Sequence, residues 1–231
     1  MHYKNIIFAM LITFFGLQLS YAQDWANLGR YQKENAQLAT PTSKEKRVVF
    51  MGNSITEIWL KTHPAFFEGK PYVNRGISGQ TTSQMVLRFR PDVINLKPSV
   101  VVILAGINDI AENTGPIALD AVAGNIFSMV ELAKENNINV VMCTVLPASD
   151  FPWRPGLAPG PKVVALNAML KKYAYAHNIP FVDYYTPMVN DALGLKKELG
   201  NDGVHPNEMG YAIMEPLVDA AISKALKQKN K

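Results

Sequence analysis

The chain alternates short apolar runs, rich in Val, Ile, Leu and Phe, with longer segments in which apolar residues recur at helical spacing. The runs expected to form strands are residues 47–51, 72–74, 100–105, 139–145 and 180–182. Strands separated by helices form parallel sheets that are covered on both faces. We therefore expect an α/β protein, a three-layer α/β/α sandwich with a five-stranded parallel sheet of the flavodoxin type.

The helical patterns lie between these runs, at residues 81–89, 116–136, 161–177 and 208–226. A further helix is expected over residues 24–38, and the polar residues 40–43 indicate a linker after it. Ligands of such sheets bind beyond the carboxyl ends of the strands, so functional residues are expected in the loops that follow the apolar runs.

The first residues have the pattern of a secretory signal, with Lys4, an apolar stretch at 6–17, and small residues at Ser20 and Ala22. The apolar stretch is too short for a membrane-spanning helix, and no cysteine for lipid attachment lies near Ala22. We expect an exported protein, periplasmic or secreted, that does not insert stably into a membrane after cleavage.

Three parts are therefore expected along the chain. Residues 1–22 form the signal peptide, 23–46 the N-terminal helix and linker, and 47–231 a single functional domain.

Charge and cysteine usage exclude several function classes. The 23 basic and 19 acidic residues are interspersed and leave a net charge of only +4, which gives no support for nucleic-acid binding. The single cysteine, Cys143, lies in an apolar run and is expected to pack as a small hydrophobe. One cysteine and four histidines also argue against a zinc site, so no metal is expected.

Four short motifs occur in a fixed order, and the first three follow apolar runs. They are Gly52-Asn53-Ser54-Ile55, Asn74-Arg75-Gly76, Gly106-Ile107-Asn108-Asp109 and Asp202-Gly203-Val204-His205. A parallel sheet would bring the first three to one edge.

Ser54 would lie at the start of a helix, where free N–H groups and the helix dipole favour negative charge. By itself this position is also typical of a helix N-cap. A serine nucleophile needs a base, and His205 has Asp202 three residues before it to orient its ring. His63 precedes a proline in a polar loop, and His177 ends a helix, so both are expected to be structural.

Taken together, the motifs resemble the SGNH, or GDSL-type, hydrolase family, whose four blocks match Ser54, Gly76, Asn108 and His205 over residues 48–222. The resemblance implies a Ser54, His205 and Asp202 triad that acts through an acyl-enzyme. It also implies an oxyanion hole built from the N–H groups of Ser54 and Gly76 and the side-chain amide of Asn108. It implies no metal or organic cofactor, and we assign Asp109 a structural role.

The first block departs from the family's commonest form, with Asn53 in place of Asp and Ile55 in place of Leu. Family members with this variant resemble bacterial enzymes that deacetylate carbohydrates. The loop at residues 147–161 is expected to overhang the same edge of the sheet, where Trp153 could stack on a sugar ring and Arg154 could bond its oxygens. The alternative is a loop that only packs its own aromatic ring. Asn53, Trp153 and Arg154 are therefore candidate substrate-binding residues.

The sequence thus predicts an exported serine esterase for short, mainly acetyl, esters of a small molecule or an oligosaccharide. One alternative is a lipid esterase of the lysophospholipase or platelet-activating-factor acetylhydrolase kind. Another, from a different class, is a non-catalytic glycan-binding protein. The sequence carries no signal for oligomeric state.

Overall fold

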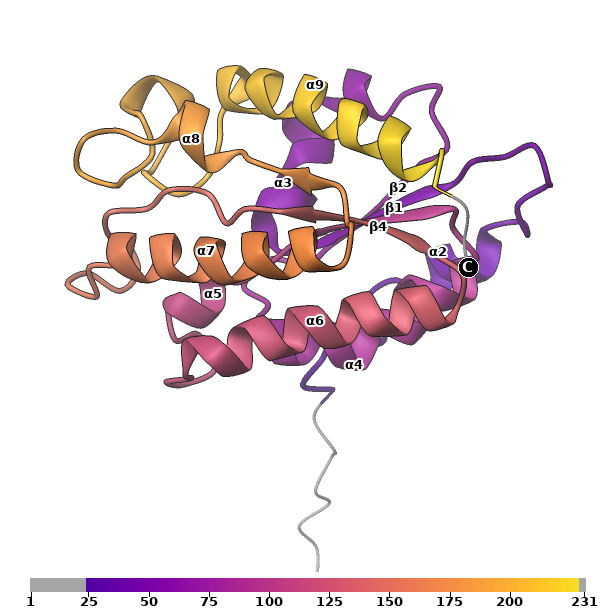
Figure 1. The fold of residues 1–231 in the computed structure, drawn as a ribbon, viewed down its shortest axis with the longest axis horizontal. Helices are drawn as coiled ribbons and strands as arrows, with labels where there is room; N and C mark the ends of the chain where they lie inside the picture. Colours follow the sequence, from indigo (N-terminus) through magenta and orange to yellow (C-terminus); the bar gives the residue numbers. More distant parts are fainter. Residues whose placement is uncertain (1–23, 229–231) are drawn as a thin grey trace, which may run out of the picture.

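The computed structural model of the chain describes residues 24–228 and contains one parallel sheet (Figure 1). Its strands, in the spatial order β2-β1-β3-β4-β5, are β1 (Val48–Gly52), β2 (Tyr72–Gly76), β3 (Val100–Leu104), β4 (Asn139–Cys143) and β5 (Phe181–Val182). All five expected strands are present, and the predicted three-layer α/β/α sandwich is confirmed.

Helices cover both faces of the sheet. On one face lie α3 (Ser54–Thr62) and α9 (Glu208–Ala225), and on the other lie α4 (Thr82–Asp92), α6 (Leu119–Glu135) and α7 (Gly160–Ala176) (Figure 1). Shorter helices are α2 (Gln32–Gln37), α5 (Ile107–Ile110), α8 (Tyr185–Met188), η1 (Pro64–Phe66), η2 (Ile94–Leu96) and η3 (Lys197–Leu199). Within residues 24–228, no helix is long and apolar enough to cross a membrane.

The central strands are apolar along their whole length because both of their faces are covered. Every residue of β1 and β3 is buried. Phe50 of β1 packs edge-on against Trp59 of α3, with ring centroids 5.9 Å apart. Burial of these runs fixes the sheet, and the sheet then carries the ends of β1, β2 and β3 to one edge.

The N-terminal segment is less helical than expected, because only Gln32–Gln37 of the predicted helix at 24–38 forms an α-helix. Before it, the Asp24 carboxylate accepts hydrogen bonds from the N–H groups of Leu28 (2.8 Å) and Gly29 (2.9 Å). Asn27 adopts a left-handed φ of 55°, which a continuous helix would not allow. The expected signal peptide, residues 1–22, lies outside the described residues.

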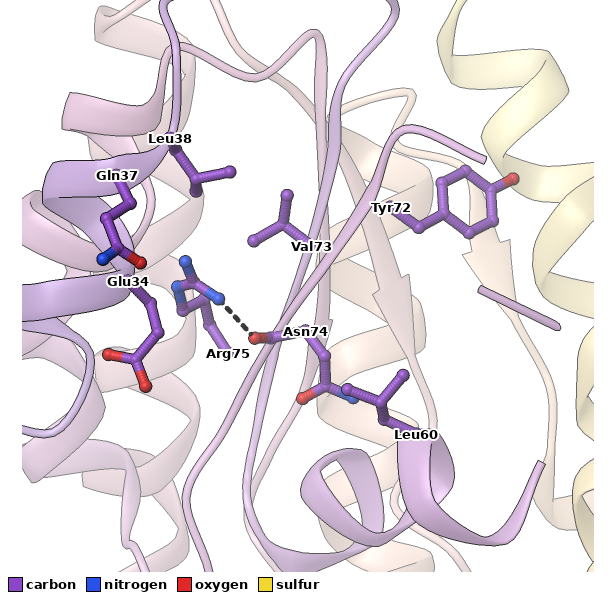
Figure 2. A pocket seen from close by; sticks show the side chains of 8 residues that line it. All are labelled: Glu34, Gln37, Leu38, Leu60, Tyr72, Val73, Asn74 and Arg75. Atoms are coloured by element: carbon purple, nitrogen blue, oxygen red, sulfur yellow. Dashed lines mark hydrogen bonds between the residues drawn. The ribbon is translucent and has the colours of Figure 1, made fainter. Parts of the chain in front are cut away.

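Strand β2 is an edge strand, but side chains occupy its open side. The Tyr31 hydroxyl donates to the Gly76 carbonyl, the Gly76 N–H donates to Asn74 Oδ1 at 2.9 Å, and Arg75 Nη1 donates to the Asn74 carbonyl at 2.7 Å. A cavity of about 370 Å³ lies beside this strand (Figure 2); its lining residues are Glu34, Gln37, Leu38, Leu60, Tyr72, Val73, Asn74 and Arg75. Occupied backbone groups protect an edge against pairing with another strand.

Candidate active site

Ser54, His205 and Asp202 form a continuous hydrogen-bonded chain. Ser54 Oγ lies 2.8 Å from His205 Nε2, and His205 Nδ1 lies 2.7 Å from Asp202 Oδ2. Ser54 is the first residue of α3, directly beyond β1, whereas His205 and Asp202 come from the loop that precedes α9. The fold therefore brings together residues that are 151 positions apart, with the imidazole between a hydroxyl and a carboxylate, as a general base requires.

The Asp202-to-His205 turn is held by the carboxylate itself. Asp202 Oδ1 accepts from the N–H groups of Val204 (3.0 Å) and His205 (2.8 Å), while Oδ2 contacts the ring. Partial burial acts to raise the pKa of Asp202, but these hydrogen bonds outweigh it and hold the pKa below its usual value. The carboxylate is therefore ionised at neutral pH and can fix the orientation of the imidazole.

The turn between β1 and α3 is built by its small and polar residues. A Cβ on Gly52 would lie 2.0 Å from Thr56 Oγ1 and 2.9 Å from the Leu104 carbonyl oxygen, so only glycine fits there. Asn53 is the helix N-cap, and its Oδ1 accepts from the Ile55 N–H at 3.1 Å. Its side chain is thus buried within the turn. Ser54, as the first helical residue, keeps an N–H without an intrahelical acceptor.

Asn108 lies in α5, the short helix that follows β3, and is buried. Its Nδ2 donates to the Gln80 carbonyl at 3.0 Å. Because an amide nitrogen carries two hydrogens, this bond fixes the amide and leaves one hydrogen for another acceptor. The same contact places the loop at residues 77–80 against Asn108.

The structure corrects the expectation that Gly76 supplies an oxyanion donor. Its N–H lies on the open side of β2 and donates to Asn74 Oδ1 at 2.9 Å. A Cβ on Gly76 would lie 2.2 Å from the Glu57 backbone nitrogen, so this glycine serves the close packing of β2 on α3. The sequence motif predicted a glycine donor in this region, but it could not identify which backbone N–H group lacks a hydrogen-bond partner.

Gly79, three residues later, has the features that were expected of Gly76. It is exposed, adopts a left-handed φ of 78°, and its carbonyl accepts from Asn113 Nδ2 at 3.0 Å. No hydrogen bond from its N–H is seen within residues 24–228. It also precedes Gln80, the residue that contacts Asn108. The sequence signal that could have identified it is a glycine in the loop between β2 and α4, at the catalytic edge of the sheet.

Asp109, beside Asn108, binds the start of α4. Its carboxylate accepts from the Thr82 hydroxyl at 2.6 Å and from the Thr82 N–H at 3.0 Å. Burial raises the pKa of Asp109 to about 6, although the Thr82 hydrogen bonds act in the opposite direction. These contacts are consistent with the structural role that the sequence suggested.

The loop at residues 147–161 reaches the triad through Trp153. Trp153 is 46% exposed, and its ring centroid lies 6.1 Å from that of His205 and 5.2 Å from that of buried Phe151. Arg154 points elsewhere. Its guanidinium donates to the Glu112 carbonyl at 2.8 Å and pairs with the Glu112 carboxylate at 2.9 Å, so it anchors the loop to the segment after α5.

The other two histidines among the described residues and the cysteine have hydrogen-bonding or packing roles outside the triad. His63 pairs with Glu215 of α9, and His177 is the C-cap of α7 with its Nδ1 2.9 Å from the Tyr173 carbonyl oxygen. Cys143 is buried in β4, and this burial raises the pKa of its thiol to about 12. Among the described residues, no group of three or more His, Cys, Asp or Glu side chains could hold a metal ion.

The chain is similar in sequence and fold to several known proteins. The model of the GDSL-like Lipase/Acylhydrolase family matches residues 50–213. A candidate acylhydrolase from Bacteroides fragilis is 55% identical, with a TM-score of 0.87 and coverage of 89% of this chain and 100% of its own. A GDSL-like lipase from Bacteroides thetaiotaomicron is 56% identical, with a TM-score of 0.85 and coverage of 87% and 98%.

Two more distant matches add less. An acetyl-xylooligosaccharide esterase from Geobacillus is 23% identical, with a TM-score of 0.60 over 77% of this chain and 94% of its own, and this likeness shows the fold alone. Among curated proteins, the uncharacterized lipoprotein YqeF of Bacillus subtilis is 32% identical over 78 residues. That match spans only 32% of either chain.

Proposed function

This chain belongs to the GDSL-like Lipase/Acylhydrolase family, a family of carboxylic ester hydrolases, and from that premise we propose that it removes short acyl groups, foremost acetyl, from carbohydrates. The observation that carries the proposal is the 2.8 Å contact between Ser54 Oγ and His205 Nε2, with Asp202 2.7 Å behind the ring. This arrangement supports serine-based ester hydrolysis.

In the proposed reaction, Ser54 Oγ attacks the ester carbonyl carbon while His205 Nε2 takes the hydroxyl proton. The resulting tetrahedral intermediate collapses as His205 returns that proton to the leaving alcohol oxygen, which leaves an acyl group on Ser54. Water then attacks the acyl carbon while His205 Nε2 takes a proton from it. As the bond between this carbon and Ser54 Oγ breaks, His205 returns the proton to Oγ and the carboxylic acid departs. Asp202 stays ionised throughout and stabilises the imidazolium.

The oxyanion would form beside three donors. These are the N–H of Ser54, the second hydrogen of Asn108 Nδ2, and the N–H of Gly79 in place of Gly76. Gly79 is supported by its exposure and by the contact between the next residue, Gln80, and Asn108. Because Asn108, Asn113 and Glu57 each bind this loop, its donors are fixed before substrate arrives.

A sugar substrate is favoured by the half-exposed indole of Trp153 next to His205. An indole face can stack on the apolar face of a sugar ring while its edge remains in water. In this proposal Asn53 acts only by shaping the turn, since its side chain is buried as a helix cap. Arg154 acts by holding the Trp153 loop.

Export is part of the proposal and rests on the signal pattern of residues 1–22. The curated relative is named a lipoprotein, whereas the only cysteine of this chain is Cys143, in β4. We therefore propose an exported enzyme that acts on an extracellular or periplasmic ester.

The test is hydrolysis of p-nitrophenyl acetate, butyrate and octanoate beside acetylated oligosaccharides. Ser54→Ala and His205→Ala serve as controls, and circular dichroism verifies that they fold. We expect preference for acetate and loss of turnover by several orders of magnitude in both variants. Preference for octanoate would favour the lipid-esterase alternative. Glycan binding without turnover of any ester would favour the non-catalytic alternative.

A further inference from the structure

We propose that Arg88 is a positioning residue of this esterase, which fixes the nucleophile turn and the oxyanion loop relative to each other. The proposal deepens the function argued above and rests on it. Arg88 lies in α4 and is fully buried, with 0% of its surface exposed, and its hydrogen-bond partners include no triad residue.

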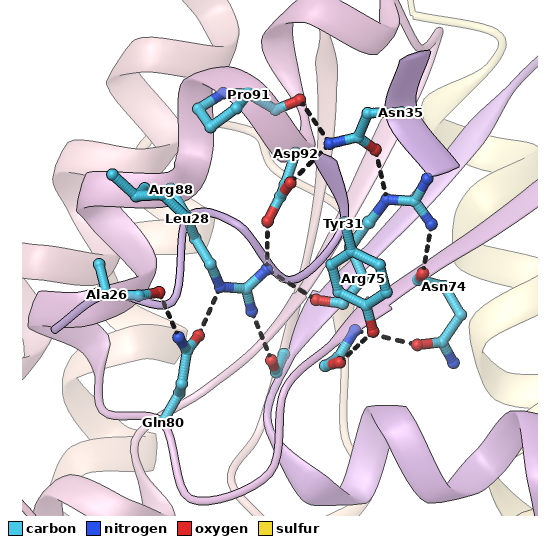
Figure 3. A network of polar contacts seen from close by, with 12 residues as sticks. Ala26, Leu28, Tyr31, Asn35, Asn74, Arg75, Gln80, Arg88, Pro91 and Asp92 are labelled. Atoms are coloured by element: carbon cyan, nitrogen blue, oxygen red, sulfur yellow. Dashed lines mark hydrogen bonds and ion pairs between the residues drawn. The ribbon is translucent and has the colours of Figure 1, made fainter. Parts of the chain in front are cut away.

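The guanidinium occupies the centre of a polar network (Figure 3). Nη2 donates to the Gly52 carbonyl at 2.9 Å, Nη1 donates to the Arg75 carbonyl at 2.9 Å, and Nε donates to Gln80 Oε1. Nη1 also forms an ion pair with Asp92 at 3.0 Å, one helical turn further along α4. A planar guanidinium can meet these acceptors together because its N–H groups point outward in fixed directions.

Two of these acceptors belong to the two halves of the proposed site. Gly52 ends β1 and stands two residues before Ser54, so its carbonyl lies at the base of the nucleophile turn. Gln80 follows Gly79, and its own carbonyl accepts from Asn108. Arg88 thus links the segment that carries Ser54 to the segment that contacts Asn108, through one rigid group.

The network continues outward to the N-terminal segment. Gln80 Nε2 donates to the Ala26 carbonyl at 2.7 Å, so both ends of the Gln80 side-chain amide are bound. Ala26 lies outside the residues matched by the family model, 50–213. Gln80 is therefore held between the N-terminal segment and Arg88, and it cannot turn without breaking a buried hydrogen bond.

A role in fold stability alone would not explain an arginine at position 88. A buried ion pair adds little net stability over well-packed apolar side chains, so fold stability alone does not require a guanidinium here. The geometry favours a guanidinium because its acceptors are the carbonyls at the ends of β1 and β2 and the side-chain oxygen of Gln80, in the loop that contacts Asn108. Displacing such groups by about 1 Å can cost around 100-fold in rate.

The experiment uses the full chain and two substitutions of Gln80, because substitutions of Arg88 leave Asp92 unpaired and endanger folding. Gln80→Met removes the acceptor of Arg88 Nε while keeping the backbone carbonyl that binds Asn108. Gln80→Glu keeps an acceptor for Arg88 but places an oxygen where Nε2 now donates to the Ala26 carbonyl. We measure kcat and KM on p-nitrophenyl acetate, together with the melting temperature.

We expect Gln80→Met to lower kcat about 10- to 100-fold with KM changed less than about threefold, because aligned donors act mainly in the transition state. Gln80→Glu should restore kcat to within about fivefold of the unsubstituted protein, because its carboxylate still binds the guanidinium. Arg88→Lys, where it folds, should show the same fall in kcat as Gln80→Met, because an ammonium group cannot reproduce the fixed, planar arrangement of the guanidinium N–H donors.

Asn35→Ala is the matched control, because Asn35 binds Arg75 and Asp92 in the same network but contacts neither Gly52 nor Gln80. It should lower the melting temperature while leaving kcat close to that of the unsubstituted protein. Equal losses of kcat in Asn35→Ala and Gln80→Met would overturn the proposal, as would unchanged kcat in folded Gln80→Met. An inactive unsubstituted protein would instead overturn the proposed esterase function.

Discussion

The indole of Trp153 lies beside the imidazole of His205, with 6.1 Å between ring centroids, while Trp153 remains 46% exposed. The two residues come from different loops, one after β4 and one before α9. An exposed aromatic face next to the proposed general base is a suitable place for the alcohol part of an ester.

Trp153→Ala should therefore reduce kcat/KM on acetylated oligosaccharides by about tenfold, the loss of one aromatic contact of about 1 kcal/mol or more. Activity on p-nitrophenyl acetate, which has no sugar ring, should change little. Tyr175→Ala is the control, since Tyr175 is 64% exposed near the end of α7 that leads into β5, far from the catalytic edge. Equal losses on both substrates would remove Trp153 from sugar recognition.

Arg154→Met should produce a weaker form of the same substrate-selective loss. It removes the ion pair with Glu112 and the bonds to the carbonyls of Ala111 and Glu112, which hold the Trp153 loop. Because the ion pair is partly exposed to solvent, we expect the melting temperature to change by only a few degrees. If Arg154 instead bonded the sugar directly, Glu112→Gln would leave oligosaccharide activity intact while Arg154→Met abolished it.

Asn108→Asp should lower kcat by about 100- to 1000-fold with a smaller change in KM, because its amide donor is expected to act on the oxyanion. The substitution keeps the shape of the side chain but puts a carboxylate oxygen where Nδ2 now donates to the Gln80 carbonyl. Steady-state kinetics on p-nitrophenyl acetate separates the two parameters. A change confined to KM would make Asn108 a ground-state binding residue.

Gly76→Ala should cost stability rather than chemistry. The added Cβ would lie 2.2 Å from the Glu57 nitrogen and 2.8 Å from the Asn53 carbonyl oxygen, both backbone atoms that cannot rotate away. We expect a loss of about 1–3 kcal/mol or more in the free energy of unfolding, measured with urea. Gly79→Ala should cost less, about 1 kcal/mol from the strain of a left-handed φ of 78°, because the only atom of the described residues within 4 Å of the added Cβ is Asn113 Nδ2, at 4.0 Å. A larger loss for Gly79→Ala would contradict the assignment of these two glycines.

Asp109 should make stability depend on pH. Because burial raises its pKa from a usual value of 3.8 to about 6, the folded state binds more protons between these values, and stability falls as pH rises from about 4 to about 6. This contribution is at most about 3 kcal/mol. The Asp109→Asn variant should lack this pH-dependent contribution. The difference in unfolding free energy between the two proteins should therefore change from about pH 4 to about pH 6 and stay constant above that range. A difference that is constant from pH 4 to 7 would contradict the raised pKa.

Much of the architecture could be predicted because local patterns determine it. Continuous apolar runs such as residues 100–105 have to be buried on both faces, and their alternation with helical patterns leaves a parallel sheet as the solution. The pairing of Asp202 with His205 is likewise local, since three residues of turn suffice to bring carboxylate and ring together. The N-terminal helix was predicted too long because Asp24 satisfies the Leu28 and Gly29 N–H groups in a non-helical turn.

What the sequence by itself determined is which chemical groups this chain can bring to one edge of a sheet, in which order, because periodicity and turn residues act over short distances. Tertiary structure alone decided which of those groups remain free. Gly76 and Gly79 stand in the same short segment, yet the Asn74 side chain binds the N–H of the first. Arg154 could have faced a substrate, but Glu112 lies within its reach. Such choices depend on side chains that meet only after folding, where a buried or fixed polar group takes the nearest partner that the packing supplies.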